Sequence, residues 1–87
     1  MKIAIVYKPY SDHARECEEW IREFEKRSSG DLEILNPELP DGESFCVARD
    51  IVEYPTIAAV GEDGKTYESW SGTPLPVIDE VIGYIVR

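Results

Sequence analysis

Few residues of this 87-residue chain are of the types that usually carry catalysis or bind metals. It has one histidine, His13, and two cysteines, Cys17 and Cys46, and it contains no Cys-X-X-Cys pair. Three such residues scattered along the sequence do not form a zinc site, so we expect no metal and no cofactor. Two cysteines in a chain without export features are typical of free thiols rather than of a disulfide framework.

Long apolar runs and an excess of positive charge are also missing. The run at residues 3–7 has five residues, too few for the core of a signal peptide or for a membrane span, so we expect a cytoplasmic protein without membrane contact. Nine basic residues against eighteen acidic ones give a net charge of −9, which disfavours nucleic acid as a partner. The length of 87 residues predicts one domain over residues 1–87. We expect the protein to be a monomer or a weak homodimer.

The first half of the chain alternates between strand and helix patterns. The β-branched residues between Ile3 and Tyr7 predict a buried strand, and apolar residues at spacings of three and four then predict a helix. We expect this helix to begin at Ser11 as N-cap, with Asp12 in its first turn, and to stop near Ser29-Gly30. A second strand is expected at Leu32 to Leu35, a loop at residues 37–44, and a short helix over residues 45–51.

The second half predicts a hairpin and a closing helix. Strands are expected at Thr56 to Val60 and at Thr66 to Trp70, joined by a turn at Asp63-Gly64. The closing helix presents an apolar stripe formed by Ile78, Val81, Ile82 and Ile85. Because a glycine inside a helix costs roughly 1 kcal/mol relative to alanine, we expect a packing reason for Gly83.

This order of elements, with the sequence YPT at 54–56 before a strand and Gly72 eight residues after Gly64, resembles the thioredoxin and glutaredoxin superfamily. The resemblance implies an α/β, thioredoxin-like fold, β-α-β-α-β-β-α, with a four-stranded mixed sheet flanked by helices. It also implies a cis-proline loop at Tyr54-Pro55, and an X-Pro bond adopts the cis form at a cost of only about 0.5–1 kcal/mol.

The local match at residues 5–21 covers the place where the family carries its redox motif. On one alignment Ser11 and Ala14 stand where the two cysteines stand, and on another the motif falls on Lys8 to Ser11, again without a cysteine. The redox cycle needs a thiolate at the helix N-terminus and a second thiol that resolves the mixed disulfide. Dithiol chemistry at this helix is therefore not expected, and the sequence predicts no catalytic residue.

Our first interpretation is a redox-inactive binding module for a protein or peptide. In this fold the loop after the first strand, the cis-proline loop and the end of the hairpin converge on one groove, whose predicted residues are Tyr10, Ser11, Asp12, His13, Tyr54, Pro55, Trp70 and Gly72. Trp70 has an alternative place in the core, on the inner face of its strand. His13 lies close to a serine and an aspartate, but adjacent residues at a helix start cannot form a Ser-His-Asp hydrogen-bond chain.

Two alternatives come from other functional classes. The sequence DGKTYES at 63–69 resembles a stretch of some glutathione transferases, which implies glutathione binding through Ser11, Tyr54, Glu68 and Ser69. The other alternative is a thiol enzyme or redox sensor that uses Cys17 or Cys46. Both cysteines lie in apolar patterns, which favours a role as small buried core residues.

Overall fold

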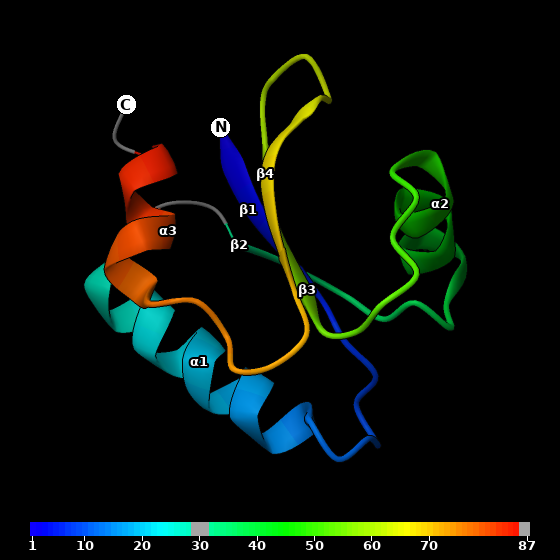
Figure 1. Ribbon diagram of the computed structural model, residues 1–87, viewed down its shortest axis with the longest axis horizontal. Coiled ribbons are helices and arrows are strands. Elements are labelled where there is room, and N and C mark those ends of the chain that lie inside the picture. Colours follow the sequence, from blue (N-terminus) through cyan, green and yellow to red (C-terminus); the bar gives the residue numbers. More distant parts are fainter. Residues whose placement is uncertain (29–31, 86–87) are drawn as a thin grey trace.

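A mixed β-sheet runs through the centre of the computed structural model, which describes residues 1–28 and 32–85 (Figure 1). Its strands are β1 (Lys2–Val6), β2 (Leu32–Leu35), β3 (Thr56–Val60) and β4 (Thr66–Ser71), in the order β2-β1-β3-β4. β1 is parallel to β2 and antiparallel to β3, and β3 is antiparallel to β4. The helices are α1 (Ala14–Arg27), α2 (Pro40–Ala48) and α3 (Ile78–Ile85). The predicted β-α-β-α-β-β-α order is therefore confirmed.

The sheet divides the core into two unequal parts. α1 and α3 cover one face and α2 covers the other (Figure 1). Because side chains alternate along a strand, Ile3 and Ile5 point to the α1/α3 face, while Ala4 and Val6 point to the α2 face. The α1/α3 side is the larger cluster and contains the buried aromatic residues Tyr7, Trp20 and Phe24.

Helix α1 attaches to the sheet through the apolar stripe that the sequence shows. Cys17, Ile21 and Phe24 are buried on it, and the ring of Trp20 stacks on that of Phe24 with centroids 5.1 Å apart. The Trp20 indole nitrogen donates a hydrogen bond of 2.9 Å to the carbonyl of Pro76, which fixes the segment before α3 against α1. α1 ends at Arg27, and the expected stop at Ser29-Gly30 falls outside the described residues.

Helix α2 begins earlier than expected. We predicted a loop over residues 37–44, but the helix starts at Pro40 and ends at Ala48. A proline in the first turn of a helix loses no hydrogen bond, and acidic residues there interact favourably with the helix dipole, as Asp41 and Glu43 do. Gly42 permits close packing, since a Cβ at that position would lie 1.9 Å from the carbonyl oxygen of Asn36.

The hairpin between β3 and β4 has the turn that its sequence predicts. Gly64 adopts a φ of +83°, a conformation that side-chain-bearing residues rarely take. The Asp63 carboxylate accepts a hydrogen bond of 3.1 Å from the Lys65 amide, which closes the turn. β4 forms an edge of the sheet, and most of its residues are exposed.

Helix α3 confirms the predicted apolar stripe but not the expectation for its glycine. Ile78 and Val81 are buried, and Ile82 and Ile85 pack against the same core. Gly83 is exposed, and among the described residues no atom lies within 4 Å of the place that its Cβ would take. No packing reason for Gly83 is found among these residues.

Within residues 1–28 and 32–85, no helix is both long and apolar enough to cross a membrane.

Candidate functional site

The entrance of α1 differs from the sequence-based expectation. The N-cap is His13, which makes no side-chain capping hydrogen bond, so the predicted Ser11 cap is wrong. The Ser11 hydroxyl instead donates a hydrogen bond of 2.6 Å to the carbonyl of Lys8. Asp12 is exposed and precedes the helix, and the acidic residue of the first turn is Glu16. Residues 8–13 therefore form a folded turn before the helix rather than its first turn.

His13 closes this turn. Its Nε2 accepts a hydrogen bond of 3.2 Å from the Lys8 amide, and as an acceptor this nitrogen carries no proton. Its ring meets that of Tyr7 edge-on at 6.4 Å. The half-buried imidazole of His13 thus stabilises the β1–α1 loop, so His13 has a structural role.

Two further segments lie beside this loop. The Tyr54-Pro55 peptide bond is cis, as expected, and the Thr73-Pro74 bond, which we did not predict to be cis, is cis as well. The Lys8 ammonium lies 5.5 Å from the centroid of the Tyr54 ring, so the β1–α1 loop contacts the cis-proline loop. The Gly72 amide donates a hydrogen bond of 2.7 Å to the Pro55 carbonyl, which brings the end of β4 to the same place. Three of the predicted segments therefore meet.

The three aromatic residues of the predicted groove do not meet. Trp70 packs on the α1/α3 face, where its ring contacts Tyr84 edge-on at 5.5 Å and its indole nitrogen donates a hydrogen bond of 3.4 Å to Glu80. Tyr54 packs on the opposite face, against the α2 cluster. Tyr10 is fully exposed in the β1–α1 loop. Trp70 therefore lies on the inner face of its strand, against the core, which was the alternative to a place in the groove. Its position on β4 opposite Ile57 directs the side chain toward α3.

The residues of the glutathione alternative serve other contacts. Glu68 and Ser69 lie in the middle of β4, opposite Ala59 and Ala58. The Glu68 carboxylate accepts a hydrogen bond of 3.0 Å from the Ser69 amide and one of 3.5 Å from the hydroxyl of Tyr84. These contacts direct the carboxylate of Glu68 to the α3 side, whereas Ser11 lies in the β1–α1 loop.

Both thiols are buried, and they lie on opposite faces of the sheet. Cys17 belongs to the α1/α3 cluster and Cys46 to the α2 cluster. Burial, with the nearby carboxylates of Glu16 and Glu18, raises the pKa of the Cys17 thiol to about 11. Burial also raises the pKa of the Cys46 thiol, although a hydrogen bond with Tyr54 and the charge of Arg49 act in the other direction. A raised pKa favours the protonated thiol over the reactive thiolate at neutral pH.

A pocket beside Tyr54 was not predicted from the sequence. It has a volume of about 250 Å³ and is lined by Pro37, Glu43, Cys46, Val47, Asp50, Ile51, Val52 and Tyr54. Val47 and Val52 are 74% and 85% exposed, which is high for apolar residues that line one pocket. One feature of the sequence could have indicated an exposed apolar surface here. Phe45, Cys46 and Val47 are consecutive in α2 and form no helical apolar stripe, so they cannot all face the sheet.

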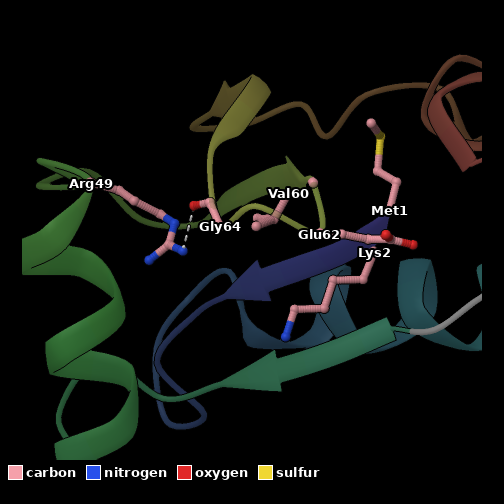
Figure 2. A pocket seen from close by; sticks show the side chains of 7 residues that line it. Met1, Lys2, Arg49, Val60, Glu62 and Gly64 are labelled. Carbon is pink, nitrogen blue, oxygen red and sulfur yellow. Dashed lines mark hydrogen bonds between the residues drawn. The ribbon is translucent and has the colours of Figure 1, made fainter.

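A larger cavity, of about 460 Å³, lies between the hairpin and the end of α2 (Figure 2). At one end of the cavity the Arg49 guanidinium lies over the Phe45 ring, 4.0 Å from its centroid, and donates a hydrogen bond of 3.1 Å to the Gly64 carbonyl (Figure 2). On the other side, Lys2 forms an ion pair of 2.8 Å with Glu33, and Glu62 adds a negative charge to the lining. Because its guanidinium is bound to the Gly64 carbonyl, Arg49 mainly joins α2 to the hairpin.

Within residues 1–28 and 32–85, no group of three or more His, Cys, Asp and Glu side chains is placed to hold a metal ion.

A scan against protein-family models finds no match, and a search of curated proteins finds no match either. Among solved structures, thioredoxin 1 from the thermophilic eubacterium Thermosipho africanus TCF52B is similar, with a TM-score of 0.71 and 18% sequence identity. The match covers 100% of this chain and 92% of that chain. The protein therefore has a thioredoxin-like fold.

Proposed function

We propose that this protein is a redox-inactive binding module that uses the thioredoxin-like fold to hold a protein or peptide partner. The loop surface, defined here as Tyr10, Ser11, Tyr54 and Gly72, is the proposed contact region, and Pro55, which we had expected in the groove, is fully buried beneath it. One observation carries the proposal: three chain segments meet before α1 and present a fully exposed tyrosine, Tyr10, where no thiol stands. Exposed aromatic residues are enriched at protein interfaces.

The lack of a thiol at this place argues against the reaction that the name of the similar solved structure suggests. The residues before and in the first turn of α1 are Ser, Asp, His and Ala, and a serine hydroxyl has too high a pKa to replace a thiolate. Cys17 lies one turn further along α1, buried under the sheet. Binding without electron transfer is the function that these residues support.

Two buried, unpaired thiols also fit a reducing compartment, and we therefore place the protein in the cytoplasm. We favour a protein or peptide over glutathione as partner. The Ser11 hydroxyl is engaged with the Lys8 carbonyl, and the Glu68 carboxylate is engaged with Ser69 and Tyr84, so a tripeptide would have to displace these contacts.

The proposal is tested by partner capture from a lysate with the intact protein and with Tyr10→Ala. Tyr67→Ala is the matched control, because Tyr67 is also an exposed tyrosine but lies on β4. We expect partners that the intact protein and Tyr67→Ala retain and that Tyr10→Ala loses. Equal partner lists for all three proteins would refute the loop surface as the binding region. Amide NMR shifts at Ser11 and Ser69 on addition of glutathione would favour the glutathione alternative instead.

A further inference from the structure

The surface over α2 has features that the loop surface does not explain. The pocket of about 250 Å³ beside Tyr54 has Cys46 and Ile51 at its inner side and the exposed valines Val47 and Val52 at its edge. Small-molecule sites usually enclose about 300–1,000 Å³, so this pocket suits one inserted side chain better than a ligand. We call Val47, Ile51, Val52, Tyr54, Glu43 and Asp50 the α2 surface.

The apolar part of the α2 surface is unusual for a helix on a sheet. A surface helix normally turns apolar residues to the core and polar residues to water. Here Val47 is 74% exposed within α2, and Val52, in the loop that follows, is 85% exposed. Single exposed apolar residues need no explanation, but these two line the same pocket. Their removal from water would contribute to the binding of an apolar side chain.

The polar part of the α2 surface is negatively charged. Glu43 and Asp50 line the same pocket and are exposed, and neither forms an ion pair within the described part of the chain. Residues 37–55 contain five acidic residues and one basic residue, Arg49. The Arg49 guanidinium turns away to the carbonyls of Phe45 and Gly64. The local field therefore attracts cations, as does the net charge of −9.

We propose that the α2 surface binds a cationic peptide segment that inserts one bulky apolar side chain beside Tyr54 and sets Lys or Arg residues against Glu43 and Asp50. The charge selects this occupant, because a second copy of this chain would bring another net charge of −9 to the same place. The proposal rests on the proposed function, since Tyr54 belongs to both surfaces, and it adds the chemical class of the partner.

A displayed library of random peptides, selected against the intact protein, tests this proposal. We expect selected peptides to combine Lys or Arg with a Leu, Ile, Phe or Trp. Their affinity should fall about tenfold for Val47→Ser/Val52→Ser and about tenfold for Glu43→Gln/Asp50→Asn at low salt, since each exposed contact contributes modestly. The second loss should shrink as salt is added, because salt screens exposed charges.

Two controls match these variants. Val77→Ser changes an exposed valine outside the α2 surface, and Glu25→Gln/Glu62→Gln removes two exposed charges elsewhere. Both should retain the affinity of the intact protein. Thermal unfolding of every variant shows whether a lost affinity reflects a lost fold.

The outcomes separate the two proposals. Peptides that lose affinity with Tyr10→Ala but not with the α2-surface variants would overturn this inference and leave the binding module standing. Selected peptides without a positive net charge would also overturn the inference. If no peptide is selected, both proposals fail for extended peptides. A dimer in solution that Val47→Ser/Val52→Ser dissociates would show that a second copy occupies the surface, and this too would overturn the inference.

Discussion

Replacement of Gly83 by alanine should stabilise the protein. Gly83 lies inside α3 with helical, not left-handed, backbone, is exposed, and has no described atom within 4 Å of its missing Cβ. The added methyl group therefore meets no obstacle, and the change reduces the entropy that the chain loses on folding. Glycine within a helix costs roughly 0.5–1 kcal/mol relative to alanine. For a domain of this size, that gain should raise the melting temperature by about 2–8 °C.

The matched control is Gly64→Ala. At Gly64 the space is equally open, with no described atom within 4 Å, but φ is +83°. An L-residue in that region costs about 1–2 kcal/mol, so this variant should melt at a lower temperature than the original. Thermal unfolding followed by circular dichroism measures both changes. If Gly83→Ala leaves the melting temperature unchanged or lowers it, the reasoning from open space and helical backbone is wrong.

Three further predictions concern the cavity by the hairpin and the buried thiols. Arg49→Ala should lower the free energy of unfolding by about 1–3 kcal/mol in urea titrations, because it removes the hydrogen bonds to the Phe45 and Gly64 carbonyls. Arg49→Lys should lower it less, because the lysine keeps the apolar stem of the side chain, and equal losses for the two variants would show that packing of this stem does not contribute. Cys17 and Cys46 should react with a thiol reagent at neutral pH only after unfolding, and fast labelling of the native protein would support the redox alternative. The pKa of Cys17, about 11 when folded against about 8.5 for a free thiol, means that the folded state retains a proton that the unfolded state loses. The contribution of Cys17 to stability should therefore be fully present below about pH 8.5 and fall toward pH 11. Cys17→Ala should weaken the loss of stability in this range, and an equal loss in the variant would assign it to other groups.

The strands and the hairpin were predictable because short-range patterns determine them. Residues 57–60 form an unbroken apolar run after Thr56, and all five residues of β3 are buried. Asp63-Gly64 predicts a tight turn, and Gly64 adopts the left-handed conformation that such a turn needs. In both cases the local signal and the packing agree.

The helix starts were harder, because alternative hydrogen bonds compete there. A serine before a helix is usually its N-cap, but the Ser11 hydroxyl finds the Lys8 carbonyl instead, and the helix begins three residues later at Ala14. The prolines and the glycine of residues 37–44 indicated a loop. The structure uses Pro40 to begin α2 and Gly42 to bring the helix close to Asn36.

The candidate site could be predicted by segment but not by side chain. The resemblance placed the β1–α1 loop, the cis-proline loop and the end of the hairpin together, and contacts such as that of Lys8 with Tyr54 agree with it. Which face Trp70 occupies depends on the register of β4 against β3, which residue patterns of an exposed edge strand do not reveal. The pocket beside Tyr54 arises from tertiary packing of α2 and had no sequence motif.

The unequal division of the core implies unequal local stability. α1 and α3 are secured by large side chains such as Trp20 and Phe24, whereas the buried cluster under α2 consists of Ala4, Val6, Leu35 and Cys46. α2 should therefore detach in a partial opening of lower free energy than global unfolding, with faster amide hydrogen exchange than α1. A partner bound over α2 would suppress this opening, so that exchange in α2 would report occupancy even when the bound and free structures are the same.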